Sequence, residues 1–422
     1  MSQETARELI DFIEKSPTSF HAVAVMEEML EGEGFAKLEE KDRWQLVPGG
    51  KYYTARNGSA LIAFTVPRKE LTGFRIIASH SDSPSFKIKE NPEMLVENQY
   101  VKLNTEGYGG MLCAPWLDRP LSVAGRIAVK EQGKIVTRLV NIDRDLVMIP
   151  NLAIHMNREA NNGYKYNPQK DLLPLFGEAS AKGKFQKILA EAAGVKEEEI
   201  LGHDLFLYNR QKGTIWGAEE EFVSIGRLDD LQCAFASLKG FLAGAKENYG
   251  AVHCVMDNEE VGSGTKQGAA STFLYDVLLR IQKALGGDYE DYLRCVADSF
   301  MISADNAHAV HPNYTEKADP VNRPYLNKGI VIKHSANQKY CTDGFSAAVF
   351  KDICRQAGVP FQTFTNRSDM PGGSTLGNIS MAQVSVNAVD VGLPQLAMHS
   401  PYETAGAKDT DYFIKAATVF FE

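Results

Sequence analysis

Acidic and imidazole side chains recur at one kind of position in this sequence, directly after an apolar run or at the start of a predicted helix. The clearest case is MDNEEVGSG at 256–264, where Glu259 and Glu260 follow the apolar run 251–256. The other residues with this placement are His80, Asp82, Asp229, Asp305 and His399. Ligands of open α/β sheets bind beyond the carboxyl ends of the strands. We therefore expect five separate segments to deliver these side chains to one crevice.

Carboxylates gathered in one crevice repel each other and lose solvation, which calls for a cation. Two imidazoles and several carboxylates without a thiolate suit Zn²⁺, Mn²⁺ or Co²⁺. The ligands outnumber the needs of one ion, whereas two ions about 3.5–4 Å apart and bridged by a carboxylate would use them, as in aminopeptidases. A lone histidine or a lone glutamate pair is more often a surface feature, so the prediction rests on the joint pattern.

Composition limits the class of protein. A chain of 422 residues is longer than one core usually grows, which predicts two domains. The net charge is −9, from 45 Lys and Arg against 54 Asp and Glu, and it argues against nucleic acid or an anionic membrane as partner. Six cysteines without a CxxC pair indicate reduced thiols. With no apolar run of about 18 residues and no signal-peptide core, we expect a cytoplasmic protein.

Periodicity indicates the elements that must position these residues. The expected helices are 4–14, 20–30, 185–193, 229–245, 269–285, 344–357 and 409–421. The expected strands are 60–66, 74–79, 125–129, 135–142, 204–208, 251–256, 300–304, 329–333, 361–365 and 384–391. Alternation of strands and helices predicts an α/β sheet covered by helices on both faces.

The residue pattern changes in the middle of the chain, where short segments of alternating apolar and polar residues lie among turn residues. We expect a discontinuous catalytic α/β domain at 1–90 and 222–422, interrupted by an inserted β-rich domain at 91–221.

The chain resembles the M18 family of metallo-aminopeptidases, the aspartyl aminopeptidases and their bacterial relatives, over essentially its whole length. The motifs that carry this resemblance are HSDSPSF at 80–86, LVMIPNLAIHMNR at 146–158, RLDDL at 227–231, DNEEVGS at 257–263, SADNAHAVHPNY at 303–314 and QLAMHSPYE at 395–403. It implies a mixed sheet like that of dinuclear-zinc exopeptidases, with an inserted oligomerisation domain that assembles dodecamers.

The resemblance also implies two divalent metal ions, most readily Zn²⁺, with Co²⁺ or Mn²⁺ as alternatives. The implied ligands are His80 and Asp305 for one ion, Glu260 and His399 for the other, and Asp229 as the bridge. Asp230 competes with Asp229 for the bridging position, because both fit the start of a helix. Two further acids are not implied ligands. Glu259 resembles the general base, and Asp82 resembles the acid that orients the His80 imidazole or tunes the metal.

Two weaker positions concern the substrate. His155 matches a histidine that the insertion presents to the active site of a neighbouring subunit, and Lys339 matches a basic position that can meet an acidic substrate side chain. His308 and His311, close to Asp305, are interpreted as pocket wall or support rather than as ligands.

Together these matches predict an exopeptidase that removes single N-terminal residues from peptides by attack of metal-bound hydroxide. Acidic residues are the expected substrates, and neutral or basic ones the alternative. Two hypotheses from other classes stay open: a metal-free hydrolase that uses Glu259 and Asp82 as an acid/base pair, and a non-catalytic assembly or binding protein descended from a peptidase.

Overall fold

The computed structural model describes residues 2–244 and 249–422. These residues divide into two compact units. The first comprises the chain up to Asp82, Gly213–Met398 and Glu403–Glu422, and the second comprises Ser83–Lys212 and His399–Tyr402. The boundaries proposed from the sequence, 90/91 and 221/222, lie eight and nine residues later than these. The earlier of them falls inside a strand that runs from Ser85 to Val96.

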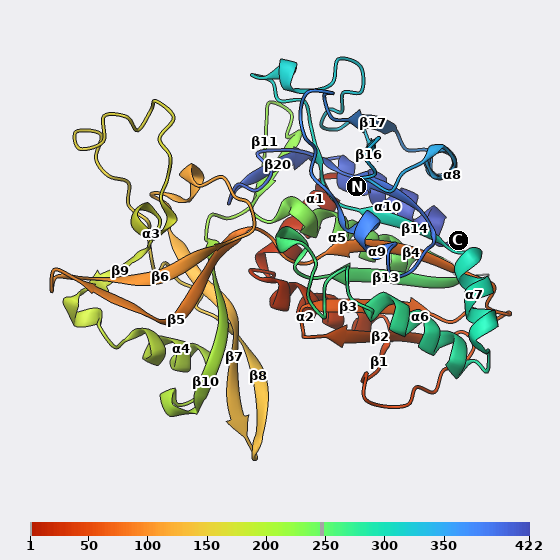
Figure 1. Cartoon of the computed structure of the whole chain (residues 1–422), viewed down its shortest axis with the longest axis horizontal. Coiled ribbons are helices and arrows are strands. Elements are labelled where there is room, and N and C mark those ends of the chain that lie inside the picture. The colour runs from red at the N-terminus through yellow and green to blue at the C-terminus, as the bar shows by residue number, and fades with distance from the viewer. Residues whose placement is uncertain (1, 245–248) are drawn as a thin grey trace. The chain divides into compact units, whose positions relative to one another are not determined.

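The first unit is built on a nine-stranded mixed sheet of order β1-β2-β3-β13-β4-β14-β18-β16-β17 (Figure 1). Its strands are β1 Ala36–Lys37, β2 Lys51–Arg56, β3 Ala60–Thr65, β4 Phe74–His80, β13 Gly250–Met256, β14 Phe300–Ala304, β16 Ile330–His334, β17 Phe361–Thr365 and β18 Asn387–Gly392. Strands β13, β4, β14 and β18 run parallel to their neighbours in that order. All residues of β13 and β14 are buried, which explains their uninterrupted apolar sequences.

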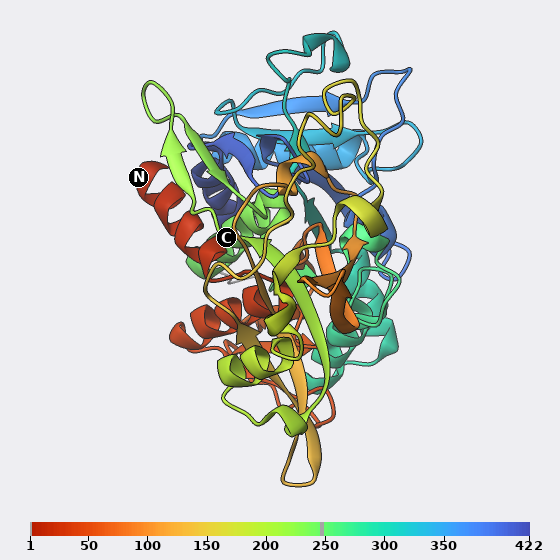
Figure 2. The same cartoon turned by 90° about the vertical axis from the view of Figure 1, so that its left-hand side faces the viewer.

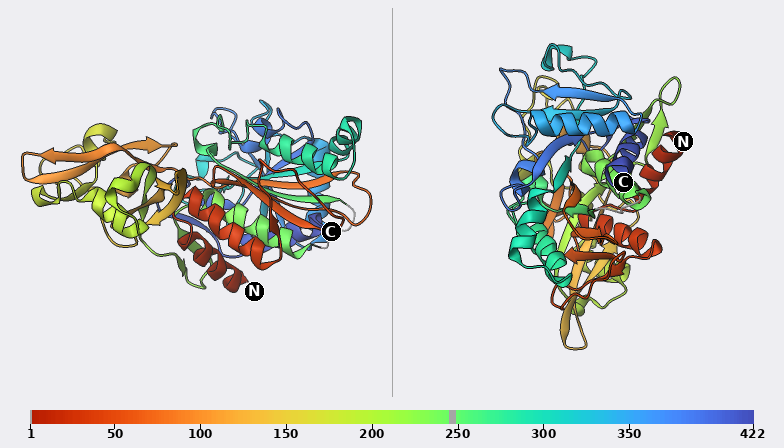
Figure 3. Two further views of the ribbon diagram at one scale, coloured as in Figure 1. Left: turned by 90° about the horizontal axis from the view of Figure 1, so that it is seen from below. Right: turned by 90° about the vertical axis from the view of Figure 1, so that its right-hand side faces the viewer.

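Helices cover both faces of this sheet (Figure 3). One core contains side chains of α1 Ser2–Glu14, α2 Ser19–Gly32, α5 Leu228–Ala243, α8 Gly344–Gln356 and α10 Asp409–Phe420. The opposite core contains side chains of α6 Phe273–Ala284, α7 Tyr289–Ala297 and α9 Leu376–Ser380. Successive residues of a strand point to opposite faces, so Ile76 belongs to one core and Ile77 to the other. The predicted fold class, a mixed α/β sheet with helices on both faces, is confirmed.

A smaller five-stranded sheet also belongs to the first unit, in the order β11-β12-β20-β19-β15. Its strands are β11 Thr214–Trp216, β12 Phe222–Ile225, β15 Ala307–His308, β19 Pro394–Leu396 and β20 Glu403–Gly406. This sheet brings the start of α5, which follows β12, to the segment that follows β14.

The second unit is a β-rich structure (Figure 2). It has its own core of buried apolar residues. Its six-stranded sheet has the order β8-β7-β10-β5-β6-β9. The elements are β5 Ser85–Val96, β6 Tyr100–Tyr108, β7 Leu121–Glu131, β8 Lys134–Asn141, α3 Pro168–Asp171, β9 Leu175–Glu178, α4 Phe185–Ala193 and β10 Ile200–Asn209. Short 3-10 helices in the chain are η1 Ala114–Trp116, η2 Ala179–Ala181, η3 Glu197–Glu199, η4 Glu259–Val261 and η5 Thr315–Lys317.

Most expected elements are present with shifted ends. The helix expected at 269–285 begins only at Phe273, and the strand expected at 384–391 begins at Asn387. Of the helix expected at 229–245, residue 245 lies outside the described residues. Helix α7 was not predicted, although Asp288 and Asp291 form a capping box at its start, a signal that the sequence does contain. Among the described residues, no helix is long and apolar enough to cross a membrane.

Candidate metal centre

Three neighbouring strands of the large sheet end at one edge, and each carries acidic or imidazole groups there. His80 is the last residue of β4, Asp305 directly follows β14, and Glu259 and Glu260 follow β13 in the short helix η4. Because β13, β4 and β14 are parallel neighbours, their carboxyl ends meet. The start of α5 adds Asp229 and Asp230 to the same edge.

These side chains approach each other closely enough to share metal ions. Donor atoms of His80, Asp229, Asp230 and Asp305 all lie within 4.8 Å of one another, and those of His80, Glu259 and Glu260 form a second such group. The Nε2 atom of His80 lies 3.6 Å from Oδ1 of Asp229. His80 therefore connects the acids of α5 and β14 to those of η4.

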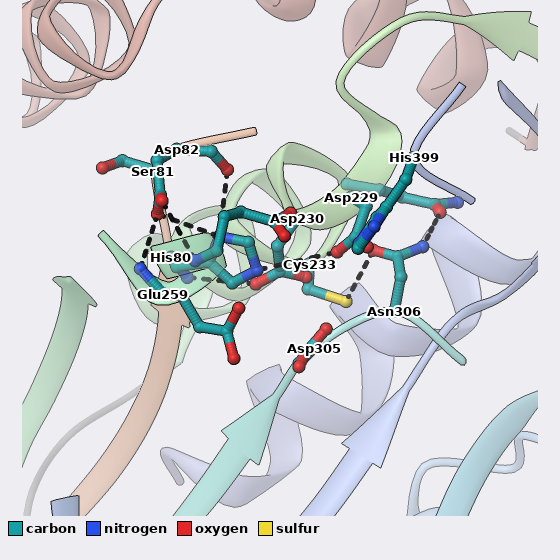
Figure 4. A network of polar contacts seen from close by, with 12 residues as sticks. His80, Ser81, Asp82, Asp229, Asp230, Cys233, Glu259, Asp305, Asn306 and His399 are labelled. Atoms are coloured by element: carbon teal, nitrogen blue, oxygen red, sulfur yellow. Dashed lines mark hydrogen bonds and ion pairs between the residues drawn. The ribbon is translucent and has the colours of Figure 1, made fainter. Parts of the chain in front are cut away.

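Asp82 contacts both the histidine and the glutamate turn (Figure 4). Its Oδ1 lies 3.3 Å from Nδ1 of His80, and that ring nitrogen also lies 3.0 Å from the Asp82 backbone carbonyl. The two carboxylate oxygens accept hydrogen bonds from the backbone N–H groups of Glu259 (3.1 Å) and Glu260 (3.2 Å). One buried carboxylate thus orients the imidazole and fixes the backbone from which both glutamates project.

The glutamate turn has further local support. Asn258 adopts a left-handed conformation with φ 61°. Its Oδ1 accepts hydrogen bonds from Thr265 Oγ1 at 2.8 Å and Gln267 Nε2 at 2.9 Å. Asp257 is buried, and its Oδ1 accepts from the Asn258 N–H. The third acid of the segment therefore supports the turn.

Asp229 and Asp230 do not begin a regular helix, contrary to the expectation that both fit a helix start. The peptide bond between them is cis, and both have non-helical φ and ψ. The Asp229 N–H donates to Oε2 of Glu403, whereas Asp230 Oδ2 accepts from the backbone N–H of His80. Asp229 thus faces the imidazole, and Asp230 contacts the His80 backbone.

Burial and mutual repulsion disfavour ionisation of these carboxyl groups. Burial raises the pKa of Glu259 to about 7 and that of Asp305 to about 6, and neighbouring carboxylates, Asp229 among them, add to both shifts. Burial also raises the pKa of Glu260 well above its usual value, with the Asp229 carboxylate as a further cause. A dication would stabilise all of these groups in their charged form. The donor set of imidazole and carboxylate therefore fits zinc.

Sequence reasoning did not single out two polar residues beside Asp305. Lys333 in β16 is buried, its Nζ lies 3.9 Å from Oδ2 of Asp305, and it donates to the backbone carbonyl of Asn306 at 2.8 Å. The Asn306 side chain donates to Gln232 Oε1 at 2.8 Å. A lysine after the apolar residues 330–332 was the available signal, because an ammonium group inside a buried strand needs a specific partner.

The remaining predicted residues are divided between the two units of the described structure. His399 groups with the second unit, where its Nδ1 contacts the Gly110 carbonyl oxygen. His155 is exposed in a loop of that unit. In the first unit, exposed Lys339 lines a pocket together with Arg367, and His308 and His311 line a neighbouring pocket.

Comparison with known proteins identifies the family of the chain. The profile of the family described as aminopeptidase I zinc metalloprotease (M18) matches residues 12–421. A protein of Clostridium acetobutylicum named probable M18 family aminopeptidase 2 is 49% identical over 99% of this chain and 98% of its own length. A protein of the same name from Pseudomonas aeruginosa is 40% identical over 100% of this chain and 99% of its own length.

Solved structures share the fold over the whole chain. Ape4, in a cryo-EM structure of the Ape4 and Nbr1 complex, is 36% identical, with a TM-score of 0.96 over 100% of this chain and 86% of that chain. The mApe1 dodecamer of S. cerevisiae is 30% identical, with a TM-score of 0.87 over 99% of this chain and 96% of that chain. The chain therefore belongs to the M18 family of zinc metallo-aminopeptidases.

Proposed function

We propose that this aminopeptidase uses two divalent metal ions, most readily Zn²⁺, to release single acidic residues from the N-termini of peptides. The observation that carries the proposal is the convergence of His80, Asp229, Asp305, Glu259 and Glu260, whose donor atoms form two overlapping groups, each within 4.8 Å. No single ion needs so many ligands.

In this proposal His80 and Asp305 would hold one ion, Glu260 and His399 would hold the other, and Asp229 would supply ligand atoms to both. Asp229 is preferred to Asp230 because its carboxylate faces the His80 ring and raises the pKa of both Glu260 and Asp305 beyond the effect of burial. Asp230 instead accepts the His80 backbone N–H. The contact of His399 Nδ1 with a carbonyl is typical of a metal-binding imidazole, which then ligates through Nε2. Bound ions would polarise the scissile carbonyl and make a water molecule acidic.

Glu259 is the proposed general base. The backbone N–H of Glu259 donates to Asp82, which gives the Glu259 carboxylate a defined position beside the proposed metal ligands. The proposed ligand set is complete without Glu259. A carboxylate there can take a proton from the attacking water and pass it to the leaving amine. Asp82 also accepts a hydrogen bond from the Glu260 N–H. It therefore fixes the proposed base and the proposed ligand relative to each other.

Glu259→Gln tests the assignment of the base. The amide keeps the shape of the side chain and cannot accept the proton, so we expect peptide hydrolysis to fall by about 10²–10⁴-fold. Zinc content per protomer, measured by atomic emission, should equal that of the wild type. Unchanged hydrolysis would refute the role, and lost zinc would make Glu259 a ligand instead.

Metal removal separates this proposal from the metal-free acid/base hydrolase. Chelation of the wild type should abolish hydrolysis, and Zn²⁺ or Co²⁺ should restore it. Activity that survives with no measurable zinc or cobalt would favour the acid/base pair of Glu259 and Asp82.

The proposed preference for acidic residues is supported by Lys339. It is exposed in a pocket with Arg367, which pairs with Asp369 at 2.7 Å. Lys339 thus offers the pocket a cation for a substrate carboxylate. Neutral or basic N-terminal residues are the alternative.

Hydrolysis rates of Asp-, Glu-, Leu- and Lys-naphthylamides decide between these substrate classes. We expect kcat/KM to be highest for the Asp and Glu compounds. A clear preference for the Leu or Lys compound would refute the acidic preference and leave the metal chemistry intact.

The second unit is proposed to serve assembly. A solved relative is a dodecamer, and we propose that this chain forms dodecamers in which His155 completes the active site of a neighbouring subunit. Its exposed position in a loop of the second unit suits contact with another chain.

A further inference from the structure

Asp390 is a buried carboxylate outside the metal centre. It lies in β18 with no exposed surface. Its Oδ2 accepts a hydrogen bond from the backbone N–H of Cys341 at 2.5 Å, and its Oδ1 accepts one from Thr375 Oγ1 at 2.8 Å. The Asp390 N–H donates to Thr342 Oγ1 at 2.9 Å. One residue therefore bonds to two segments that are distant in sequence.

Those two segments form the walls of one pocket. Residues 335–343 connect β16 to α8 and carry Lys339, and residues 366–375 connect β17 to α9 and carry Arg367, Met370 and Gly372. Cys341 and Thr375 lie at the ends of these loops. Asp390 is thus hydrogen-bonded to both walls.

The first residues of α9 pack closely against the Asp390 carboxylate. Thr375 is the N-cap residue of α9, a position where threonine usually bonds to the first turn of its own helix. Its side chain makes no such bond and donates to Asp390 instead. A Cβ on Gly377 would lie 2.7 Å from Asp390 Oδ1 and 2.7 Å from the Ser303 side chain, so only glycine lets α9 approach this carboxylate.

We propose that Asp390 is a positioning residue that sets the distance between the two walls of the substrate side-chain pocket, and thereby its selectivity. This inference rests on the proposed function, in which this pocket receives the side chain of the N-terminal residue. A buried carboxylate that loses a donor must find another or be hydrated. Loss of one bond to Asp390 therefore moves the attached wall.

Thr375 provides the matched pair of variants for a test. Thr375→Val removes the hydroxyl at constant shape and releases only the 366–375 wall. Thr375→Ser retains the hydroxyl and should act as the wild type. The readout is the ratio of kcat/KM for the naphthylamide that the wild type prefers to kcat/KM for Ala-naphthylamide, whose methyl group reaches little of the pocket.

We expect Thr375→Val to lower this ratio about tenfold, mainly through KM, since displaced binding groups cost binding of the longer side chain. Zinc content should not change. An unchanged ratio in Thr375→Val, or an equal loss in Thr375→Ser, would overturn the inference. The ratio uses whichever substrate the wild type prefers, so it tests the inference even if that substrate is not acidic. The acidic preference itself is tested on the wild type alone, with the naphthylamide panel.

Hydrogen exchange on the full-length protein gives a readout that needs no activity. Thr375→Val should speed exchange in peptides from 366–380 and leave those from 335–343 unchanged, whereas Asp390→Ala should speed exchange in both, including the Cys341 amide. Equal protection in all three proteins would overturn the anchoring role of Asp390, even if the proposed peptidase activity also failed.

Discussion

Asp409 is a single carboxyl group whose ionisation should affect the stability of the whole chain. It is fully buried at the start of α10, where Oδ2 accepts from the Asn327 N–H at 2.7 Å and Oδ1 from the Gly329 N–H at 3.1 Å. These bonds favour the charged form, but burial outweighs them and raises the pKa of Asp409 to about 7. The folded state therefore binds this proton more tightly than the unfolded state, whose pKa is near 3.8.

Asp409→Asn should remove a pH dependence. A raised carboxyl pKa contributes stability that is complete below the unfolded pKa and is lost as pH rises to the folded one. Between pH 5 and 7 the free energy of unfolding of the wild type should therefore fall relative to the variant by about 2 kcal/mol, and it should level off above pH 7. Urea unfolding of both zinc-saturated proteins from pH 5 to 8 measures this difference. A constant difference would contradict the raised pKa.

At the residue scale, most of the candidate metal centre could be predicted from the sequence. Strand-end placement is a local property, and it identified Glu259, Glu260, Asp305 and His80 without a structure. The residues alone did not distinguish Asp229 from Asp230, because both fit a helix start. The preference for Asp229 came from the resemblance to the M18 family, and the position of its carboxylate beside the imidazole supports it.

At the scale of elements, the metal centre depends on the close passage of β18 beside the segment that follows β14. A Cβ on Gly392, the last residue of β18, would lie 1.9 Å from the backbone carbonyl oxygen of Asp305. The backbone cannot move there without moving the carboxylate. A glycine in β18 therefore fixes the position of an expected ligand.

Gly392→Ala should damage both stability and metal binding. The extra methyl group meets backbone atoms, so we expect a loss of about 1–3 kcal/mol in the free energy of unfolding and a lower zinc content. Gly344→Ala is the matched control, since a Cβ there meets nothing within 4 Å and alanine favours helix α8. Thermal unfolding and metal analysis test both. Wild-type values for Gly392→Ala would contradict this account.

At the scale of the whole molecule, the proposed dodecamer makes one subunit depend on another. Glu259→Gln lacks the base, and His155→Ala lacks the residue proposed to act across the interface. Neither variant alone should hydrolyse peptides efficiently. Their sites are nevertheless complementary if His155 acts in a neighbouring active site.

Mixed oligomers of the two variants should regain activity. When equal amounts are dissociated and reassembled, up to about one quarter of sites should combine an intact Glu259 with a neighbour's His155. Activity of the mixture is compared with that of each variant treated in the same way. Absence of recovery, with mixed oligomers present by native mass spectrometry, would show that His155 does not act in trans.

The sequence by itself determined the fold class and the chemistry at the edge of the sheet. Apolar runs and helical periodicity are local patterns, and parallel strands collect their carboxyl ends at one edge, so acids placed after such runs converge. The convergence of these acids could therefore be predicted from the order of strands and helices along the chain.

Only the tertiary structure decided which buried polar groups support this site. Lys333 meets Asp305 and Asn306, and Asp390 meets Cys341 and Thr375, through pairs that share no local pattern. A buried charge is stable only where packing brings it a partner. The partners come from separate strands and loops, and the register of β14, β18 and β16 in the folded sheet brings them together.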